Sequence, residues 1–509
     1  MLNKLESLFS NKILILLILL GLMVRFLYFP DNVYFAYDQA RDAFISQKIF
    51  QGDFKIVGPP ASVPGLFHGA LSYYILAILY KLFEGNPFSL SAIFRIYNLI
   101  GIIPLYIIAN KLFGKTTALL SAFIYAVSFE QTQYALFLGH PSLAVGSVLI
   151  YYLGLTMLLK EKNKSGLYYS FIGLALSIQF HLSLSILIIQ FIPILLFLLR
   201  KKVLILKDVF IPSFTFFLII SSYFMAELKF GFQNIKTLTN MFFEGTGNGL
   251  YPKNLLLIFY RYINHNFLNA NLYITLIILI ILMVTLISIL KNIKTKISGY
   301  ILLAWLVFGT IPYIRSISTL TVYYYSIGGS IALIILFSYL IYRITKKTKL
   351  GYLIMVPILF SNFNLIKNNN KNGTIPEICV QDKMLLSDEL RIIDYMYIES
   401  KGGNFSVNAL TNPFNVNTTW SYLFEWYGEK LYGRVPVWGG WAAPGYEGNL
   451  KVVTSQSSLP STRFTIFEPR RGIPGNLYEE FKFTENQFWK IEEERSFGDF
   501  IVQKRTFFQ

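Results

Sequence analysis

The sequence predicts a polytopic α-helical membrane protein, followed by a small extracytoplasmic domain of α/β or α+β type. Of 509 residues, 54% are hydrophobic and only 14% are charged, whereas soluble proteins carry about 25% charged residues. Residues 1–366 contain 29 Lys and Arg against 11 Asp and Glu, a net charge of +18, while residues 367–509 contain 16 and 17, a net charge of −1. The positive charge therefore belongs to the apolar part, which argues against a nucleic-acid-binding surface.

The apolar part contains about 11 segments of membrane-spanning length, because a helix needs roughly 20 apolar residues to cross a bilayer. These segments are 12–30, 90–110, 116–134, 141–159, 166–182, 183–199, 208–226, 269–290, 298–314, 320–342 and 350–366. The first resembles a secretory signal but has no small-residue cleavage site, so we interpret it as a retained anchor. A further apolar stretch, 66–83, is shorter.

Basic residues indicate which ends of the spans face the cytoplasm, because short loops rich in Lys and Arg stay inside. The basic loops contain Lys111/Lys115, Lys160/Lys162/Lys164, Arg200/Lys201/Lys202/Lys207, Lys291/Lys294/Lys296 and Arg343/Lys346/Lys347/Lys349. With 11 spans and the N-terminus inside with Lys4 and Lys12, all five loops are cytoplasmic. A crossing by 66–83 would reverse the N-terminus, so we expect that stretch to lie at the outer surface.

This topology predicts two parts, a membrane module over 1–366 and a soluble extracytoplasmic domain over 367–509. The outer side of the module receives loop 31–89, a short loop near 135–141, and loop 227–268. The tail begins with a polar linker at 368–372, and continues with a predicted helix over 387–400 and strand-like runs FSVNAL, VPVWGGW, LKVVTS, FTIFEP and DFIVQK. Its single cysteine, Cys379, excludes an intrachain disulfide.

Three charged residues follow the first span closely. In the segment YDQARD, Asp38, Arg41 and Asp42 share one face of a predicted helix over 38–51, because positions i, i+3 and i+4 are neighbours on a helix. A carboxylate can act as a general base toward a hydroxyl or amine, and an arginine can hold a phosphate through two hydrogen bonds. The alternative is a solvated surface ion pair, which is common and weak.

Other ionisable residues gather on the same predicted side of the membrane. They are His68, His140, His181 and His265, with Arg95 at the outer turn of the second span and Glu227 at the end of the seventh. A structural role is more common for any one of these histidines. Their joint placement favours a site on the outer face, since ionisable groups at membrane depth usually line functional cavities.

A metal site is a weaker interpretation. Asp38, Asp42 and a histidine would offer oxygen and nitrogen ligands. The sequence contains no close-spaced ligand pair such as HxxxH, so we assign no metal ligands. No cofactor is predicted, although a divalent cation is compatible with these residues.

The order of these features resembles the GT-C superfamily of polyprenyl-phosphate-sugar-dependent glycosyltransferases. One span is followed by YDQARD, then by GPPASVPGLFHGALSYY, then by a helical bundle with short loops and an extracytoplasmic tail. The sequence looks most similar to the family 39/83 branch, which is related to protein O-mannosyltransferases and the aminoarabinose–lipid A transferase. The resemblance covers roughly residues 10–366.

The resemblance implies roles for individual residues. Asp38 matches the acid that opens the first-loop helix and acts as catalytic base. The family often has Asp-Glu there, whereas this chain has Asp38-Gln39 and a second acid at Asp42. The implied site consists of Asp38 and Asp42 as catalytic residues, Arg41, Arg95 and His181 at the donor phosphate, and Gln39, His68, His140, Gln179 and Glu227 around the substrates.

The implied activity is inverting transfer of a sugar from polyprenyl phosphate to a lipid, glycan or protein acceptor in the cell envelope. We expect the protein in the cell membrane, and the basic loops predict that its N-terminus is cytoplasmic. Two alternatives remain open. One is a transporter or flippase of a lipid-linked saccharide, and the other is a polysaccharide ligase. The mostly apolar spans and the absence of a nucleotide-binding motif favour the lipid-linked donor.

Overall fold

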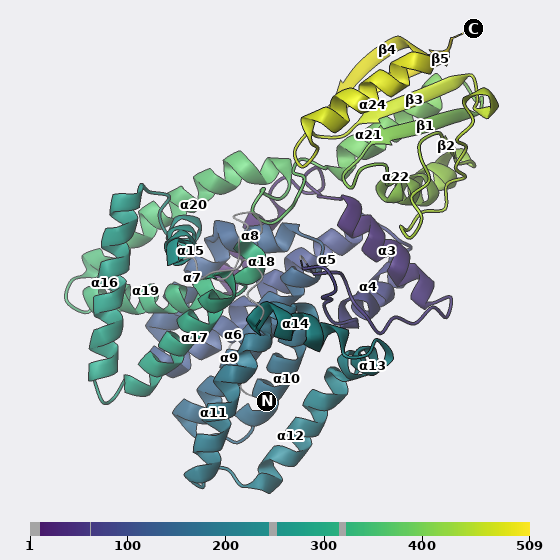
Figure 1. Ribbon diagram of the computed structural model, residues 1–509. Coiled ribbons are helices and arrows are strands. Elements are labelled where there is room, and N and C mark those ends of the chain that lie inside the picture. The colour runs from purple at the N-terminus through teal and green to yellow at the C-terminus, as the bar shows by residue number, and fades with distance from the viewer. Residues whose placement is uncertain (1–10, 62, 244–251, 315–321, 509) are drawn as a thin grey trace. The chain divides into compact units, whose positions relative to one another are not determined.

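The computed structural model describes residues 11–61, 63–243, 252–314 and 322–508 (Figure 1). The chain divides into two compact units. The first contains Met1–Leu27, Lys55–Ser72 and Ala92–Asn370, and the second contains Tyr28–Phe54, Tyr73–Ser91 and Lys371–Gln509. The first-loop segment with Asp38 therefore belongs to the same compact unit as the C-terminal tail. The predicted boundary at residue 367 separates membrane-embedded residues from a soluble domain, and it stays a prediction.

The first unit is a helical bundle. Its helices are α2 (Lys12–Phe26), α6 (Ile102–Phe113), α7 (Lys115–Val127), α8 (Phe129–Leu136), α9 (His140–Glu161), α10 (Gly166–Phe180), η1 (Leu182–Ser185), α11 (Ile186–Arg200), α12 (Leu206–Ile219), α13 (Ser221–Lys229), α14 (Gln233–Phe243), α15 (Pro252–Asn266), α16 (Leu272–Lys291), α17 (Lys296–Ile314), α18 (Val322–Tyr325), α19 (Gly329–Thr345), η2 (Lys349–Ile354), α20 (Met355–Asn369) and η3 (Asn370–Asn372). Helix α5 (Pro87–Ile100) begins in the second unit and continues into the first.

Many of these helices are long and apolar enough to cross a membrane. Six qualify within the described residues, or seven if the bent pair Leu206–Ile219 and Ser221–Lys229 is one span, and four apolar helices are shorter. The shorter ones are Leu71–Leu82, Lys115–Val127, Gly166–Phe180 and Gly329–Thr345. Several apolar helices support the predicted multi-pass membrane protein, while the count of about 11 spans stays a prediction.

Each of the 11 predicted segments overlaps a helix of the structure, and several of the segments contain more than one helix. The predicted span 208–226 is bent by 53° between α12 and α13. The amide of Gln179 donates from Nε2 to the Ile219 carbonyl over 2.7 Å and to Ser222 Oγ over 2.9 Å. A side chain that takes a helical carbonyl in this way interrupts the hydrogen-bond ladder and bends the helix. Lys4 and the first residues of the predicted span 320–342 lie outside the described residues.

Small residues allow α9 and α10 to pack closely. A Cβ atom on Gly154 would lie 2.4 Å from the backbone N of Ser170, and one on Gly173 would lie 2.3 Å from the backbone N of Tyr151. Membrane helices use small residues in this way to bring their backbones together. These contacts hold the first half of α10 against the middle and second half of α9.

The second unit combines first-loop helices with a mixed sheet. Its helices are α3 (Tyr37–Ile49), α4 (Leu71–Leu82), α21 (Leu386–Glu399), α22 (Thr418–Leu423), the π-helical turn η4 (Phe424–Glu429), α23 (Lys430–Tyr432), the 3₁₀ turn η5 (Gln456–Ser458) and α24 (Gly475–Phe488). Its strands are β1 (Phe405–Leu410), β2 (Val437–Trp438), β3 (Thr462–Phe467), β4 (Trp489–Phe497) and β5 (Phe500–Phe507), in the order β2-β1-β3-β5-β4. Parallel β2-β1-β3 and antiparallel β3-β5-β4 pairings confirm the predicted mixed helix-and-strand domain.

The predicted tail elements match this sheet in part. FSVNAL, FTIFEP and DFIVQK form β1, β3 and β5, and the helix predicted over 387–400 is α21. VPVWGGW contributes only the short β2, and LKVVTS contributes only a bridge from Val452 to Trp438. Strand β4 and helix α24 were missed. β4 reads WKIEEERSF and is mostly exposed, so it lacks the apolar alternation by which a strand is recognised.

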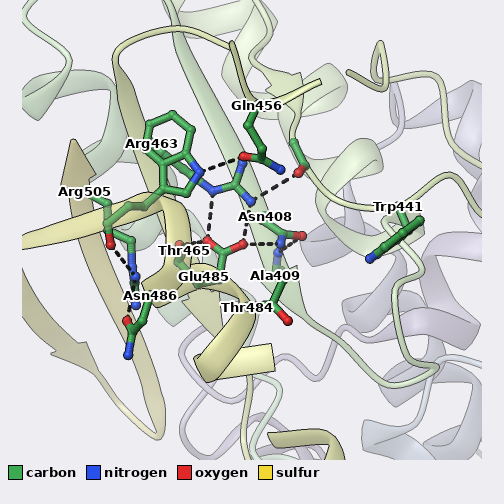
Figure 2. A network of polar contacts seen from close by, with 12 residues as sticks. Asn408, Ala409, Trp441, Gln456, Arg463, Thr465, Thr484, Glu485, Asn486 and Arg505 are labelled. Atoms are coloured by element: carbon green, nitrogen blue, oxygen red, sulfur yellow. Dashed lines mark hydrogen bonds and ion pairs between the residues drawn. The ribbon is translucent and has the colours of Figure 1, made fainter. Parts of the chain in front are cut away.

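A buried ion pair joins α24 to the sheet (Figure 2). Arg463 on β3 and Glu485 on α24 are 1% and 3% exposed. Arg463 Nε donates to Glu485 Oε2 over 2.8 Å, and the same carboxylate accepts from Thr465 Oγ1 and Asn408 Nδ2 over 2.6 and 2.8 Å. Burial alone would raise the pKa of Glu485, but Arg463 and these hydrogen bonds outweigh it and lower the pKa. The carboxylate is thus fully engaged in holding the domain together.

Candidate functional site

The three charged residues of the first loop meet on α3, as their helical spacing predicted. Arg41 donates from Nη1 to Asp38 Oδ1 over 2.7 Å, and from Nε and Nη2 to Asp42 Oδ1 over 2.9 and 2.6 Å. The side chain of Asp42 is 6% exposed, whereas that of Asp38 is 47% exposed. One carboxylate of the group is therefore open to a reactant, and the other is enclosed.

Burial makes this group electrostatically unusual. It raises the pKa of Asp42 to about 6, against the opposing effect of Arg41 and with a smaller contribution from Asp38. Burial also lowers the pKa of Arg41, but its two carboxylate partners outweigh that effect and raise the pKa well above the usual value. Arg41 consequently stays charged and is shared by two acids, with its guanidinium occupied on three nitrogens.

The beginning of α3 is held by a segment of the tail. The N–H of Phe35 donates to the Met384 carbonyl over 3.0 Å, and the N–H of Leu386 donates to the Val33 carbonyl over 2.9 Å. Gln39, predicted to bind substrate, is 2% exposed, and its Oε1 accepts from the N–H of Ala36 over 3.2 Å. It thereby satisfies one of the backbone donors at the start of the helix. Asp38 lies in the first turn of α3, where the helix dipole stabilises a negative charge.

A glycine-rich loop of the tail contacts the same helix. The loop runs over 439–449 with the sequence GGWAAPGYEGN. The ring of Tyr446 packs edge-on against Tyr37, with centroids 5.9 Å apart, and Glu447 forms an ion pair with Lys48. Trp441 is 68% exposed. The loop therefore contacts α3 at its first turn through Tyr446 and at its last turn through Glu447, and it carries an exposed aromatic ring.

Three of the four histidines converge in the first unit. His68, His140 and His181 each offer a ring nitrogen, and these nitrogens all lie within 4.8 Å of one another. His68 and His181 are buried, and His140 is partly exposed. His265 lies elsewhere, with its Nδ1 2.8 Å from the hydroxyl of Tyr323. The sequence placed these residues on one side of the membrane but did not indicate that three of them form a cluster.

The other predicted substrate- and phosphate-binding residues are enclosed by protein. Arg95 is 0% exposed and donates from Nη1 to the Arg25 carbonyl over 2.8 Å. Gln179 is 1% exposed, and its amide is engaged at the bend between α12 and α13. Glu227 is 8% exposed on α13, where its Oε2 accepts from the N–H of Ile235 over 3.4 Å. Their predicted roles stay untested.

A buried arginine in the first unit was missed by the sequence reasoning. Arg261 on α15 is 5% exposed, and its Nη2 donates to Glu130 Oε1 over 3.4 Å and to Ser326 Oγ over 2.9 Å. Its guanidinium lies over the ring of Tyr323, 4.2 Å from the centroid. Within the described residues, its Nε and Nη1 are buried without a hydrogen-bond partner. Buried donors of a charged group that have no acceptor among the described residues call for a further partner, such as water or an anion.

Glu130 contacts Arg261 through its Oε1, which accepts from Arg261 Nη2. It is 0% exposed and also accepts from Asn266 Nδ2 over 2.6 Å and from Ser330 Oγ over 3.0 Å. Its carboxylate is therefore saturated, in contrast to the guanidinium that it contacts. The available signal was an acid inside the predicted span 116–134, because acids at membrane depth are rare.

Comparisons with known proteins agree with this architecture. Residues 68–225, under a third of the chain, match the model of the dolichyl-phosphate-mannose-protein mannosyltransferase family. ArnT from Cupriavidus metallidurans, solved with bound undecaprenyl phosphate, is similar over 96% of this chain and 97% of its own, with a TM-score of 0.58 and 10% sequence identity. The chain has the GT-C fold. This confirms the resemblance predicted from the sequence.

A second GT-C structure is similar over less of its length. The oligosaccharyltransferase from Archaeoglobus fulgidus, solved with Zn and sulfate, matches 84% of this chain with a TM-score of 0.50 and 13% identity. The present chain spans 62% of that protein. No curated protein sequence matches the chain. The stretch matching the mannosyltransferase family contains the three clustered histidines but begins after Asp38.

Proposed function

We propose that the chain is an integral-membrane glycosyltransferase. It transfers a sugar from a polyprenyl-phosphate donor to an acceptor hydroxyl or amine on the extracytoplasmic face of the cell membrane, with inversion at the anomeric carbon. The observation that carries the proposal is the half-exposed carboxylate of Asp38, held by Arg41 in the first turn of α3. The GT-C fold and a relative bound to undecaprenyl phosphate support the choice of donor.

Asp38 has the features of a general base. Arg41 fixes the orientation of the carboxylate through a hydrogen bond from Nη1 to Asp38 Oδ1. Its exposure leaves an oxygen accessible to an acceptor. Arg41 was predicted to bind phosphate, but three of its nitrogens donate to Asp38 and Asp42. We therefore assign Arg41 to the positioning of Asp38.

Arg261 is the stronger candidate for the donor phosphate. It combines a permanent charge with two buried N–H groups that have no partner among the described residues. Phosphate oxygens would accept charge-assisted hydrogen bonds from these donors, which are shorter and stronger than hydrogen bonds between neutral groups. The resulting charge neutralisation stabilises the phosphate as it leaves.

The loop over 439–449 is our candidate for acceptor recognition. It contacts α3 through Tyr446 and Glu447, and it presents the exposed ring of Trp441. Aromatic rings offer an apolar face beside a polar edge, a combination that suits a saccharide acceptor.

The reaction is a single displacement. Asp38 takes the proton from the acceptor hydroxyl while the acceptor oxygen forms a bond to the anomeric carbon. The bond from that carbon to the phosphate oxygen breaks, and its electron pair stays with the phosphate. The products are the glycoside and polyprenyl phosphate. Phosphate is already a stable anion, so the leaving group requires no proton from a general acid, and one carboxylate suffices.

A transporter or flippase of a lipid-linked saccharide is the main alternative, since transporters use broken helices. The bend between α12 and α13 has a local cause in the Gln179 side chain. A polysaccharide ligase is the second alternative, and it differs in its donor.

The testing experiment incubates purified full-length protein with a panel of polyprenyl-phosphate sugars and envelope glycans. The transferase predicts stoichiometric release of polyprenyl phosphate and a covalent glycoside. A transporter predicts movement of labelled donor between vesicle leaflets with no covalent product. A ligase predicts turnover only with a diphosphate-linked polysaccharide donor. Either of the last two outcomes would replace the proposal.

A further inference from the structure

We infer that His68, His140 and His181 form a binding site for one divalent transition-metal ion of the zinc class. Their ring nitrogens converge within 4.8 Å from three separate segments: the stretch before α4, the start of α9, and the junction of α10 with η1. The inference is independent of the proposed glycosyl transfer, since it concerns only metal binding.

The ligand set selects the class of metal. Imidazole nitrogen suits Zn²⁺, Cu²⁺, Ni²⁺ and Co²⁺, whereas Mg²⁺, Ca²⁺ and Mn²⁺ prefer carboxylate and carbonyl oxygen. Among the residues that the structure describes, the group contains no carboxylate and no thiol. Three histidines leave one position of a tetrahedral zinc ion for water or another exchangeable ligand.

The distances fit after a small closure. Nitrogen atoms on one tetrahedral zinc ion lie about 3.4 Å apart, given bonds of roughly 2.0–2.1 Å. The three rings already lie close together, with centroids 4.2 Å apart for His68 and His140, 4.6 Å for His68 and His181, and 5.6 Å for His140 and His181. His140 and His181 are stacked, and His68 is tilted against both. Movements of about 1.4 Å or less bring the nitrogens to coordination distance.

Hydrogen bonds orient two of the rings as metal ligands. The Nδ1–H of His140 donates to the Phe180 carbonyl over 2.7 Å, which leaves the lone pair on Nε2. His181 Nδ1 lies 2.6 Å from Ser183 Oγ, so a proton on Nδ1 can be held there in the same way. Metal-binding histidines commonly donate their second nitrogen to a carbonyl or another polar group, and this contact fixes the ring.

His68 needs one rearrangement. The N–H of Leu182 donates to its Nδ1 over 3.0 Å, so His68 carries its proton on Nε2 in the metal-free protein. Metal binding requires a turn of the ring and exchanges this hydrogen bond for a metal bond. His140 is the partly exposed ring of the three.

The test uses full-length protein stripped with a chelator and then titrated with Co²⁺ or Zn²⁺ in the absence of any sugar donor. We expect a visible Co²⁺ absorption band, one bound ion per chain after dialysis, displacement by Zn²⁺, and no competition from excess Mg²⁺. His140→Gln and His181→Gln should each weaken binding by at least about tenfold. His265→Gln is the matched control, because this histidine is partly exposed, like His140, and lies outside the cluster.

Each outcome decides the inference. His140→Gln alters the most exposed ring, so it tests the site even if His181→Gln fails to fold. Wild-type protein that retains no Zn²⁺ would overturn the inference. Retention of full affinity by His140→Gln, or equal loss in His265→Gln, would also overturn it, because the ion would then be bound elsewhere.

Discussion

Two arginine–carboxylate groups in the second unit differ in the exposure of their carboxylates. This difference distinguishes a group that stabilises the fold from one that can take part in a reaction. In the Arg463–Glu485 group, both side chains are almost fully buried, and the carboxylate accepts from Arg463, Thr465 and Asn408. In the Arg41 group, Asp42 is enclosed while Asp38 is half exposed. An engaged carboxylate has no capacity left for a substrate, whereas an oriented and accessible one can accept a proton.

The largest effect is expected in the enclosed group. Arg463→Met should lower the free energy of unfolding of the C-terminal domain by about 3–5 kcal/mol, because Glu485 would remain buried without its charge partner. Denaturant unfolding followed by tryptophan fluorescence would measure the loss. The double variant Arg463→Met, Glu485→Leu should recover much of the stability. A single variant as stable as wild type would contradict the structural role.

The variant Arg261→Gln tests whether the guanidinium of Arg261 binds the phosphate of the sugar donor. Arg261→Gln should raise the donor concentration for half-maximal rate by roughly 10–100-fold, since a hydrogen bond to a charged group contributes about 1.5–3 kcal/mol. Arg25→Gln is the control, because Arg25 is also buried and donates to Asn98 and to the Gly21 and Ala126 carbonyls. We expect this control to lose stability without weakening the donor. Equal effects in both variants would reject Arg261 as the phosphate ligand.

Asp42 should make both the stability and the activity of the Asp38–Arg41–Asp42 group depend on pH. Its pKa is raised from 3.8 to about 6, so its contribution to stability is present at low pH and is lost as pH rises from about 4 to 6. Activity should follow the opposite course. Activity should fall below about pH 6, because protonated Asp42 no longer neutralises the charge of Arg41. Arg41 then attracts the Asp38 carboxylate more strongly and makes it a weaker proton acceptor. Asp42→Asn should abolish this limb of the pH–rate profile. An unchanged limb would assign it to another residue.

The smallest effect concerns the buried carboxyl group of Glu389. Both oxygens of Glu389 are buried without a hydrogen-bond partner among the described residues, and burial, with Glu468 and Asp388 nearby, raises its pKa. Burial also raises the pKa of Glu468 to about 7. Stability of the domain should therefore fall as pH rises from about 4.5 to 7. Glu389→Gln should reduce that fall and stabilise the domain at pH 8 by about 1 kcal/mol. Destabilisation at pH 8 would show that the charge is needed.

The sequence predicted features that depend on local spacing. Apolar length located the helices, and the spacing of Asp38, Arg41 and Asp42 predicted that they share a helix face. Features that depend on distant pairing were missed. Arg261 and Glu130 are 131 residues apart in the chain, and His68 meets His181 only after the bundle has formed. The bend between α12 and α13 likewise depends on Gln179 from another helix.

The most direct test compares the transfer rate of Asp38→Asn with that of wild type, using labelled polyprenyl-phosphate sugar. Asp388→Asn is the matched control, because Asp388 also lies in the first turn of a helix and pairs with an arginine three residues later. We predict that Asp38→Asn slows release of polyprenyl phosphate by about 10²–10⁴-fold, while Asp388→Asn transfers sugar at the wild-type rate. Wild-type release by correctly folded Asp38→Asn would contradict the assignment of Asp38 as the base.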